Sequence, residues 1–198
     1  MKYLDHDNKY EALHVRIQEC LVSYPLHERN ILDTCLDIGA NIGGFSVVAS
    51  PKFKKIVAIE ANSDSVLCMK SILEEKNINN VDVYHYAVSD SANKVVKLYK
   101  INEGGKESSG NASTEVLNAR PGAYKVFDEY DLVTTIDLEN AVKLLDCQYV
   151  DYLKIDCEGA EYKFLINKDL SRIRFIVGEF HAGYLNNNEL DSLWSHIR

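Results

Sequence analysis

The chain has 198 residues, of which 46% are hydrophobic and 26% charged, values that fit one ordinary globular domain. Its net charge of −8 disfavours nucleic acid as a partner, because an acidic surface repels phosphate backbones. The five scattered cysteines form no CxxC pair and indicate neither a zinc site nor a disulfide framework, and no signal peptide or membrane-spanning apolar run is evident. We therefore predict a cytoplasmic protein with no nucleic-acid partner and no membrane contact. Its oligomeric state stays open.

Short apolar segments alternate with segments of helical spacing along most of the chain. A helical lead-in, 1–30, is expected to contain a helix over 10–24, where Leu13 and Ile17 recur on one face. The alternation that follows predicts an α/β fold over 31–198, a doubly wound, mostly parallel, Rossmann-like sheet within a single domain. The expected strands are 31–38, 55–60, 81–86, 149–155 and 174–179, and the expected helices are 45–50, 64–76 (capped by Ser63), 161–167 and 189–197.

The middle of the sequence departs from this alternation. Lys94–Ile101 and Lys125–Ile136 are rich in β-branched and aromatic residues, which predicts an added antiparallel β insertion. Between them, Glu103–Thr114 is rich in Gly, Ser and Asn and is predicted to be a mobile loop, which either closes over substrate or is a surface excursion.

The segment LDIGANIGGFSVVA, Leu36–Ala49, carries the strongest binding signal. A predicted strand ends in Asp37, and the glycines of GANIGG then allow a tight turn in which the backbone approaches a ligand. A dinucleotide-binding turn would read GxGxxG, whereas Asn41 replaces the second glycine here. The Asp37 carboxylate suits the sulfonium and ammonium groups of S-adenosylmethionine and would repel a pyrophosphate. We therefore predict S-adenosylmethionine, rather than NAD, as the cofactor.

Parallel sheets bind ligands beyond the carboxyl ends of their strands, at the point where the strand order reverses. Glu60 ends the second predicted strand, where its carboxylate can accept hydrogen bonds from both ribose hydroxyls. After the third strand, Ala87 or Val88 either packs on an adenine ring or simply packs at the strand end. The predicted cofactor-binding residues are Asp37, Gly39, Ala40, Asn41, Gly43, Glu60, Ala61, Ala87 and Asp156.

These segments resemble the FkbM family of class I methyltransferases, and the similarity spans most of the chain. It is carried by LDIGANIGGFSV, VAIEANSDSVLCMKSIL, AVSD, DYLKIDCEGAEYKFL and IVGEFH, of which DYLKIDCEGAE is the most family-specific. The resemblance implies S-adenosylmethionine binding through Asp37, Gly39, Asn41 and Glu60, with Asp156 at the reaction side. It also implies methyl transfer to oxygen on a small molecule, often a sugar or polyketide-type hydroxyl. Class I methyltransferases usually finish with two more strands, so we expect an incomplete C-terminal β-hairpin here, through truncation or in a shortened variant.

Carboxylates and a histidine follow the fourth and fifth predicted strands. Methyl transfer to a hydroxyl needs an aligned acceptor and a base that takes its proton. We predict Asp156, Glu158 and His181 as the catalytic residues; His181 is either the general base, because its ordinary pKa lies near neutrality, or a structural histidine. Glu161 opens a predicted helix, where a negative charge is favourable. No complete ligand set is visible, so no metal is predicted.

Two other functions stay open. The acceptor is a protein or nucleic-acid amine in the first, although the Asn/Asp-Pro-Pro-aromatic motif of many DNA amino-methyltransferases is absent and Asp156–Gly159 occupies its place. In the second, the chain is a non-catalytic nucleotide-binding module on the same fold. The sequence names neither the acceptor nor the pathway.

Overall fold

The computed structural model describes residues 6–24, 26, 32–103, 106–113, 125–181 and 187–197. Its elements follow the expected alternation of strand and helix, interrupted by an insertion of strands. In chain order they are α1 (His6–Ser23), β1 (Leu32–Ile38), α2 (Gly44–Ala49), the 3-10 turn η1 (Ser50–Lys52), β2 (Phe53–Glu60), α3 (Ser63–Glu75), β3 (Val81–His85), β4 (Ala87–Val88), β5 (Val95–Glu103), β6 (Lys106–Ser113), β7 (Lys125–Ile136), α4 (Leu138–Lys143), β8 (Tyr152–Ile155), α5 (Glu161–Leu165), β9 (Ile176–Gly178) and α6 (Asn187–Ile197).

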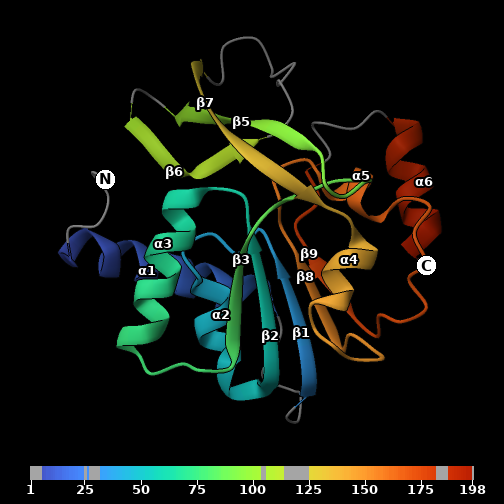
Figure 1. The fold of residues 1–198 in the computed structure, drawn as a ribbon, viewed down its shortest axis with the longest axis horizontal. Helices are drawn as coiled ribbons and strands as arrows, with labels where there is room; N and C mark the ends of the chain where they lie inside the picture. Colours follow the sequence, from blue (N-terminus) through green and yellow to red (C-terminus); the bar gives the residue numbers. More distant parts are fainter. Residues whose placement is uncertain are drawn as a thin grey trace.

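Five parallel strands form the main sheet in the order β3-β2-β1-β8-β9 (Figure 1). The chain moves outward from β1 to β3 and then returns to the other side of β1 with β8, so the strand order reverses between β1 and β8. In this register Asp37 lies opposite Ala58 on β2 and Lys154 on β8. The predicted doubly wound parallel sheet is confirmed, and its switch point lies where the sequence places Asp37 and Asp156.

Helices cover both faces of this sheet, because neighbouring residues of a strand point to opposite faces. Leu36 and Ile38 of β1 pack in a core with residues of α4, α5 and α6. Cys35 of β1 packs on the other face with Phe45 and Ala49 of α2. Asp37 shares the face of Cys35, so its side chain points toward α2 rather than into the larger core.

The insertion forms a second sheet, in the order β4-β7-β5-β6. It lies across the carboxyl ends of β1, β2 and β3 (Figure 1). The predicted antiparallel pairing of β5 with β7 is confirmed. The prediction of a loop over Glu103–Thr114 is wrong for most of that segment, because β6 pairs antiparallel with β5; residues 104, 105 and 114 lie outside the described residues. The segment forms a strand despite its polar composition, because β5 supplies hydrogen-bond partners for the backbone of β6.

Several boundaries also differ from the expectation. The side chain of Asn62, not Ser63, caps α3, because its Oδ1 accepts hydrogen bonds from the amides of Asp64 and Ser65. The short elements β4 and α4 were not predicted, and α1 begins at His6 rather than at Tyr10. Ile31, the first residue of the first expected strand, lies outside the described residues.

The described residues contain no strand after β9, which is therefore an edge of the main sheet within the part of the chain that the structure describes. All five cysteines are free thiols in this structure. Among the described helices, none combines the length and the apolar character needed to cross a membrane.

Candidate active site

A cavity of about 440 Å³ lies at the carboxyl ends of the main strands. Its wall combines the turns after β1, β2 and β8 with α1 and with Leu98 of the second sheet. Asp37 and Gly43 are not among the residues of this wall. The predicted site residues that do line the cavity are Gly39, Ala40, Asn41, Glu60, Ala61, Ala87, Asp156, Glu158 and His181.

The turn after β1 depends on backbone conformations that few residues adopt. Gly39 has φ +69°, and a Cβ there would lie 1.7 Å from the carbonyl oxygen of Asp156. The amides of Gly39 and Ala40 both donate to the Ile59 carbonyl, at 3.0 and 3.1 Å, which ties the turn to β2. Asn41 has φ +52°, a left-handed conformation that asparagine tolerates, so it can stand where a dinucleotide-binding turn has glycine.

Glu60 braces this turn from the end of β2. Its Oε2 accepts a hydrogen bond from the Asn41 amide at 2.8 Å, and its Oε1 accepts one from the Asn62 amide at 2.7 Å. Partial burial raises the pKa of the Glu60 carboxyl, against the opposing effect of these two amides. Because each carboxylate oxygen can accept a further hydrogen bond, Glu60 can still take hydroxyl donors from the cavity.

Asp37 is fully buried beside the cavity rather than on its wall. Its Oδ2 accepts a hydrogen bond from the Ser46 hydroxyl at 2.7 Å, and its Oδ1 lies 3.2 Å from Nζ of Lys154. The Lys154 ammonium also donates to the carbonyls of Ile38 and Gly39, at 3.2 and 2.8 Å. The Asp37 charge is therefore balanced within the protein, and the argument that it would directly repel a pyrophosphate is wrong.

Gly43 likewise supports the turn from outside the cavity wall. It precedes α2 with φ +90°, and a Cβ there would lie 2.8 Å from the Met69 side chain. Glycine is thus required at this position, both for the backbone conformation and for close packing against α3.

Asp156 connects the end of β8 to β1 and to α1. Its amide donates to the Ile38 carbonyl at 3.1 Å, and its Oδ2 accepts a hydrogen bond from the Tyr24 hydroxyl at 3.2 Å. Burial and the nearby Asp156 charge raise the pKa of Tyr24, which therefore stays a neutral donor. Asp156 is partly exposed to the cavity and is held in place from two sides.

A carboxylate, an imidazole and a second carboxylate lie in a row beyond Asp156. Nδ1 of His181 lies 3.0 Å from Oε1 of the buried Glu161, and Nε2 lies 3.3 Å from Oε2 of Glu158. Glu158 itself has φ +53°, which is uncommon for a residue with a side chain. His181 therefore bridges the turn after β8 and the start of α5.

This arrangement changes the protonation of His181. Burial lowers the pKa of its imidazole, but the hydrogen bond and charge of Glu161, with the charges of Glu158 and Asp156, outweigh burial and raise the pKa to about 9. His181 is thus positively charged at neutral pH, which favours the structural alternative over the general base. Burial also raises the pKa of Glu158, which makes that carboxylate a stronger base than an exposed glutamate.

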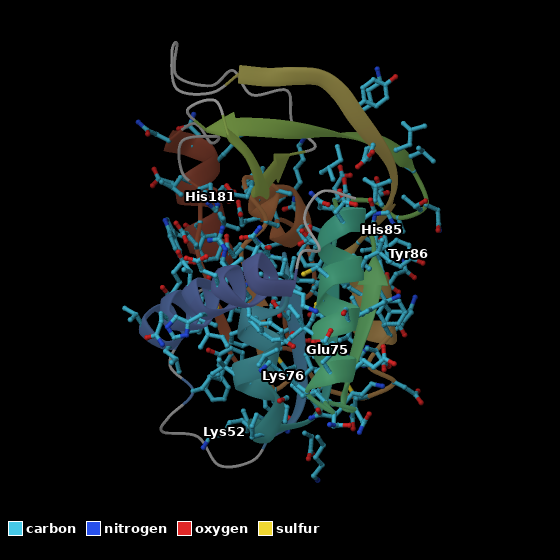
Figure 2. All side chains as sticks on the ribbon, turned by 90° about the vertical axis from the view of Figure 1, so that its left-hand side faces the viewer. Lys52, Glu75, Lys76, His85, Tyr86 and His181 are labelled. Atoms are coloured by element: carbon cyan, nitrogen blue, oxygen red, sulfur yellow. The ribbon has the colours of Figure 1, made fainter. Side chains whose placement is uncertain are left out.

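Asp156, Glu179 and His181 each offer one potential ligand atom, and these atoms lie within 4.8 Å of one another. Both ring nitrogens of His181 already face carboxylates, so we assign no metal to this cluster. His85 lies well apart from His181 (Figure 2), and its Nε2 is 2.8 Å from the Ala61 carbonyl.

Sequence reasoning missed several contributors to the cavity. Arg16 and Cys20 line it from α1, Tyr24 does so directly after that helix, and Leu98 does so from β5. Helical spacing indicated that α1 has an inward face but not which strand ends that face covers. The lysine in the apolar strand YLKI was a usable signal, because a buried ammonium needs an acidic partner, and Lys154 forms an ion pair with Asp37.

The model of the methyltransferase FkbM domain matches residues 37–198, which is most of the chain. The chain belongs to this family. The match begins at Asp37, so it includes the glycine turn, Glu60, and the segment from Asp156 to His181. The resemblance read from the sequence motifs is thereby confirmed.

Solved structures of methyltransferases are distantly similar to this chain. Methyltransferase FkbM from Methylobacillus flagellatus KT has 16% identity and a TM-score of 0.42, over 71% of this chain and 30% of that one. Precorrin-6y C5,15-methyltransferase from Geobacter metallireducens GS-15 has 14% identity and a TM-score of 0.45, over 94% and 68%. Phosphoethanolamine N-methyltransferase 1 from Haemonchus contortus, solved with S-adenosylhomocysteine, has 16% identity and a TM-score of 0.31, over 41% and 18%. The chain thus spans less than a third of the length of the first and third of these proteins. No curated protein matches it significantly.

Proposed function

We propose that this FkbM-family chain binds S-adenosylmethionine in the cavity and transfers its methyl group to a hydroxyl of a small molecule, such as a sugar or a polyketide-type acceptor. The observation that carries the proposal is that Glu60 and the Gly39–Asn41 turn share one cavity wall with Asp156 and Glu158. A site for a nucleoside and a site for proton transfer are thus next to each other. A cytoplasmic location is retained as part of the proposal.

The cofactor end of the cavity fits a nucleoside. Glu60 keeps acceptor capacity for ribose hydroxyls while its backbone partners hold it still. Ala61 and Ala87 are small residues that leave space for a flat ring. Gly39, where a side chain would collide with Asp156, lets the backbone of the turn form the floor of the cavity. Asp37 supports this floor indirectly, through Lys154.

When bound, S-adenosylmethionine would supply an electrophilic methyl group at its sulfonium. The acceptor hydroxyl has to be aligned with that group and to lose its proton. Asp156 is held by Tyr24 and by the backbone of β1, which suits it to orient the acceptor. Glu158 has a raised pKa and lines the cavity, which suits it to take the proton. His181, already protonated, serves neither role directly.

Calorimetry with S-adenosylhomocysteine and with NAD tests the cofactor assignment. We expect saturable one-to-one binding of S-adenosylhomocysteine and no heat with NAD. Binding of NAD alone would replace the methyltransferase with a nucleotide-binding module. Turnover is tested by formation of S-adenosylhomocysteine from S-adenosylmethionine with a panel of neutral sugars and polyols, and with a lysine-rich peptide and single-stranded RNA as the competing acceptors.

A further inference from the structure

Glu161 performs more than the helix-terminal role that its sequence position indicates. It is the first residue of α5 and is only 1% exposed. A buried carboxylate is costly unless hydrogen bonds compensate for lost water. Glu161 has such partners on two sides, in the turn after β8 and in the segment after β9.

The first set of partners flanks Glu158. Oε1 of Glu161 accepts hydrogen bonds from the amides of Cys157 at 3.0 Å and Gly159 at 3.2 Å, and Oε2 lies 3.1 Å from the Gly159 amide. These are the residues immediately before and after Glu158, whose left-handed backbone is energetically unfavourable for a residue with a Cβ. The Glu161 carboxylate therefore holds this conformation from both sides.

The second partner is His181. Its Nδ1 lies 3.0 Å from Oε1 of Glu161 while its Nε2 lies 3.3 Å from the Glu158 carboxylate. The charged groups that face the ring are Glu161 from α5, Glu158 and Asp156 from the turn after β8, and Glu179 from its own segment. Four carboxylates around one imidazole favour its protonated form.

We propose that Glu161 is a positioning residue for Glu158: it fixes the Glu158 backbone through the two flanking amides, and it fixes the Glu158 carboxylate through His181, whose ring lies between the two carboxylates. The ionised carboxylate is thereby kept at the cavity wall, where it accepts the proton of the acceptor hydroxyl. That last use of Glu158 rests on the proposed function, whereas its placement by Glu161 does not.

The test is an NMR titration of the His181 ring in the full chain between pH 5 and 10.5. In the wild-type protein we expect a midpoint at about 9. In Glu161→Gln the midpoint falls by more than about one pH unit, toward the ordinary histidine value, and the amides of Cys157 and Gly159 exchange faster. Glu139→Gln is the matched control, because Glu139 is exposed on α4, where its carboxylate forms an ion pair with Lys143. It should leave the midpoint unchanged.

A second measurement follows the Glu158 carboxyl by ¹³C NMR. His181→Gln removes the neighbouring positive charge, so the pKa of Glu158 rises further than in the wild-type protein. A purely structural role of Glu161 would lower the melting temperature without moving either titration. A wild-type His181 midpoint near 6.5, or a Glu158 pKa unmoved in His181→Gln, overturns the proposal even when Glu161→Gln does not fold.

Calorimetry with S-adenosylhomocysteine on the same samples separates this inference from the proposed function. Normal cofactor binding together with an ordinary His181 titration rejects the positioning role alone. A raised His181 midpoint in a protein that does not bind S-adenosylhomocysteine supports the positioning geometry and rejects the methyltransferase proposal.

Discussion

Replacing Glu60 with glutamine provides the sharpest test of the cofactor end. Both carboxylate oxygens accept a backbone amide, from Asn41 at 2.8 Å and from Asn62 at 2.7 Å. A glutamine has one oxygen and one NH₂ group, so in either orientation a donor faces a donor. One hydrogen bond to a charged acceptor is lost, which costs about 1.5–3 kcal/mol of folding stability. Urea unfolding should report a loss of this size.

The same substitution removes the acceptor that we propose for the ribose hydroxyls. Loss of one charge-assisted hydrogen bond, worth about 1.5–3 kcal/mol, weakens the binding of S-adenosylhomocysteine roughly 10- to 150-fold. Calorimetry on Glu60→Gln, with Glu139→Gln as the control of equal charge change, measures this loss. A 2′-deoxy analogue separates hydroxyl recognition from distortion of the turn, because the variant should discriminate less between the two ligands. A dissociation constant within threefold of wild type in the folded variant would refute the placement of Glu60 on the ribose.

Three further substitutions test the remaining parts of the site. Gly39→Ala should lower the free energy of unfolding by more than about 2 kcal/mol, because the left-handed φ is unfavourable for alanine and the added Cβ would collide with Asp156. A variant as stable in urea as the wild type would show that the turn after β1 can move away from the turn after β8 without cost. Lys154→Met should cost about 3–5 kcal/mol by leaving the Asp37 charge buried and unpaired, and adding Asp37→Asn should recover part of that loss; an equally unstable double variant would contradict the ion-pair argument. Asp156→Asn should abolish S-adenosylhomocysteine formation with any hydroxyl acceptor that the wild type methylates while the circular dichroism spectrum is kept; full turnover would remove Asp156 from the reaction.

The sequence predicted the main sheet because its signal is local and strong. Short apolar runs that end in Asp37, Glu60 and Asp156 mark strands buried on both faces, and their alternation with helices leaves few topologies. The strand β6 was missed because its composition is polar, and its partner β5 is what makes it a strand. The α3 cap was assigned one residue late because both Asn62 and Ser63 can cap a helix, and only the backbone shows which one does.

The sequence predicted which residues lie at the candidate site but not which side chains they contact. Strand ends gave Glu60, Asp156 and His181, since these positions follow from topology alone. The charge state of His181 did not follow, because it depends on Glu161, 20 residues earlier in the chain. The face of the sheet to which the Asp37 side chain points could be predicted, because side chains alternate between the two faces along β1. Its partner Lys154 could not, because it comes from a strand 117 residues later in the chain. Long-range partners of this kind decide whether a carboxylate faces a ligand or the protein.

Hydrogen bonds and a close backbone approach link the turns after β1 and β8, and these two turns line the two ends of the cavity. The Asp156 amide donates to the Ile38 carbonyl, and the Lys154 ammonium donates to the carbonyls of Ile38 and Gly39. Gly39 brings its Cα so close to Asp156 that no side chain fits between them. An in-line transfer depends on a fixed separation between donor and acceptor, and an error of about 1 Å can cost a hundredfold in rate. Backbone atoms and one buried ion pair hold the two turns together, so a methyl donor and an acceptor bound as proposed would be held at a separation that the fold sets.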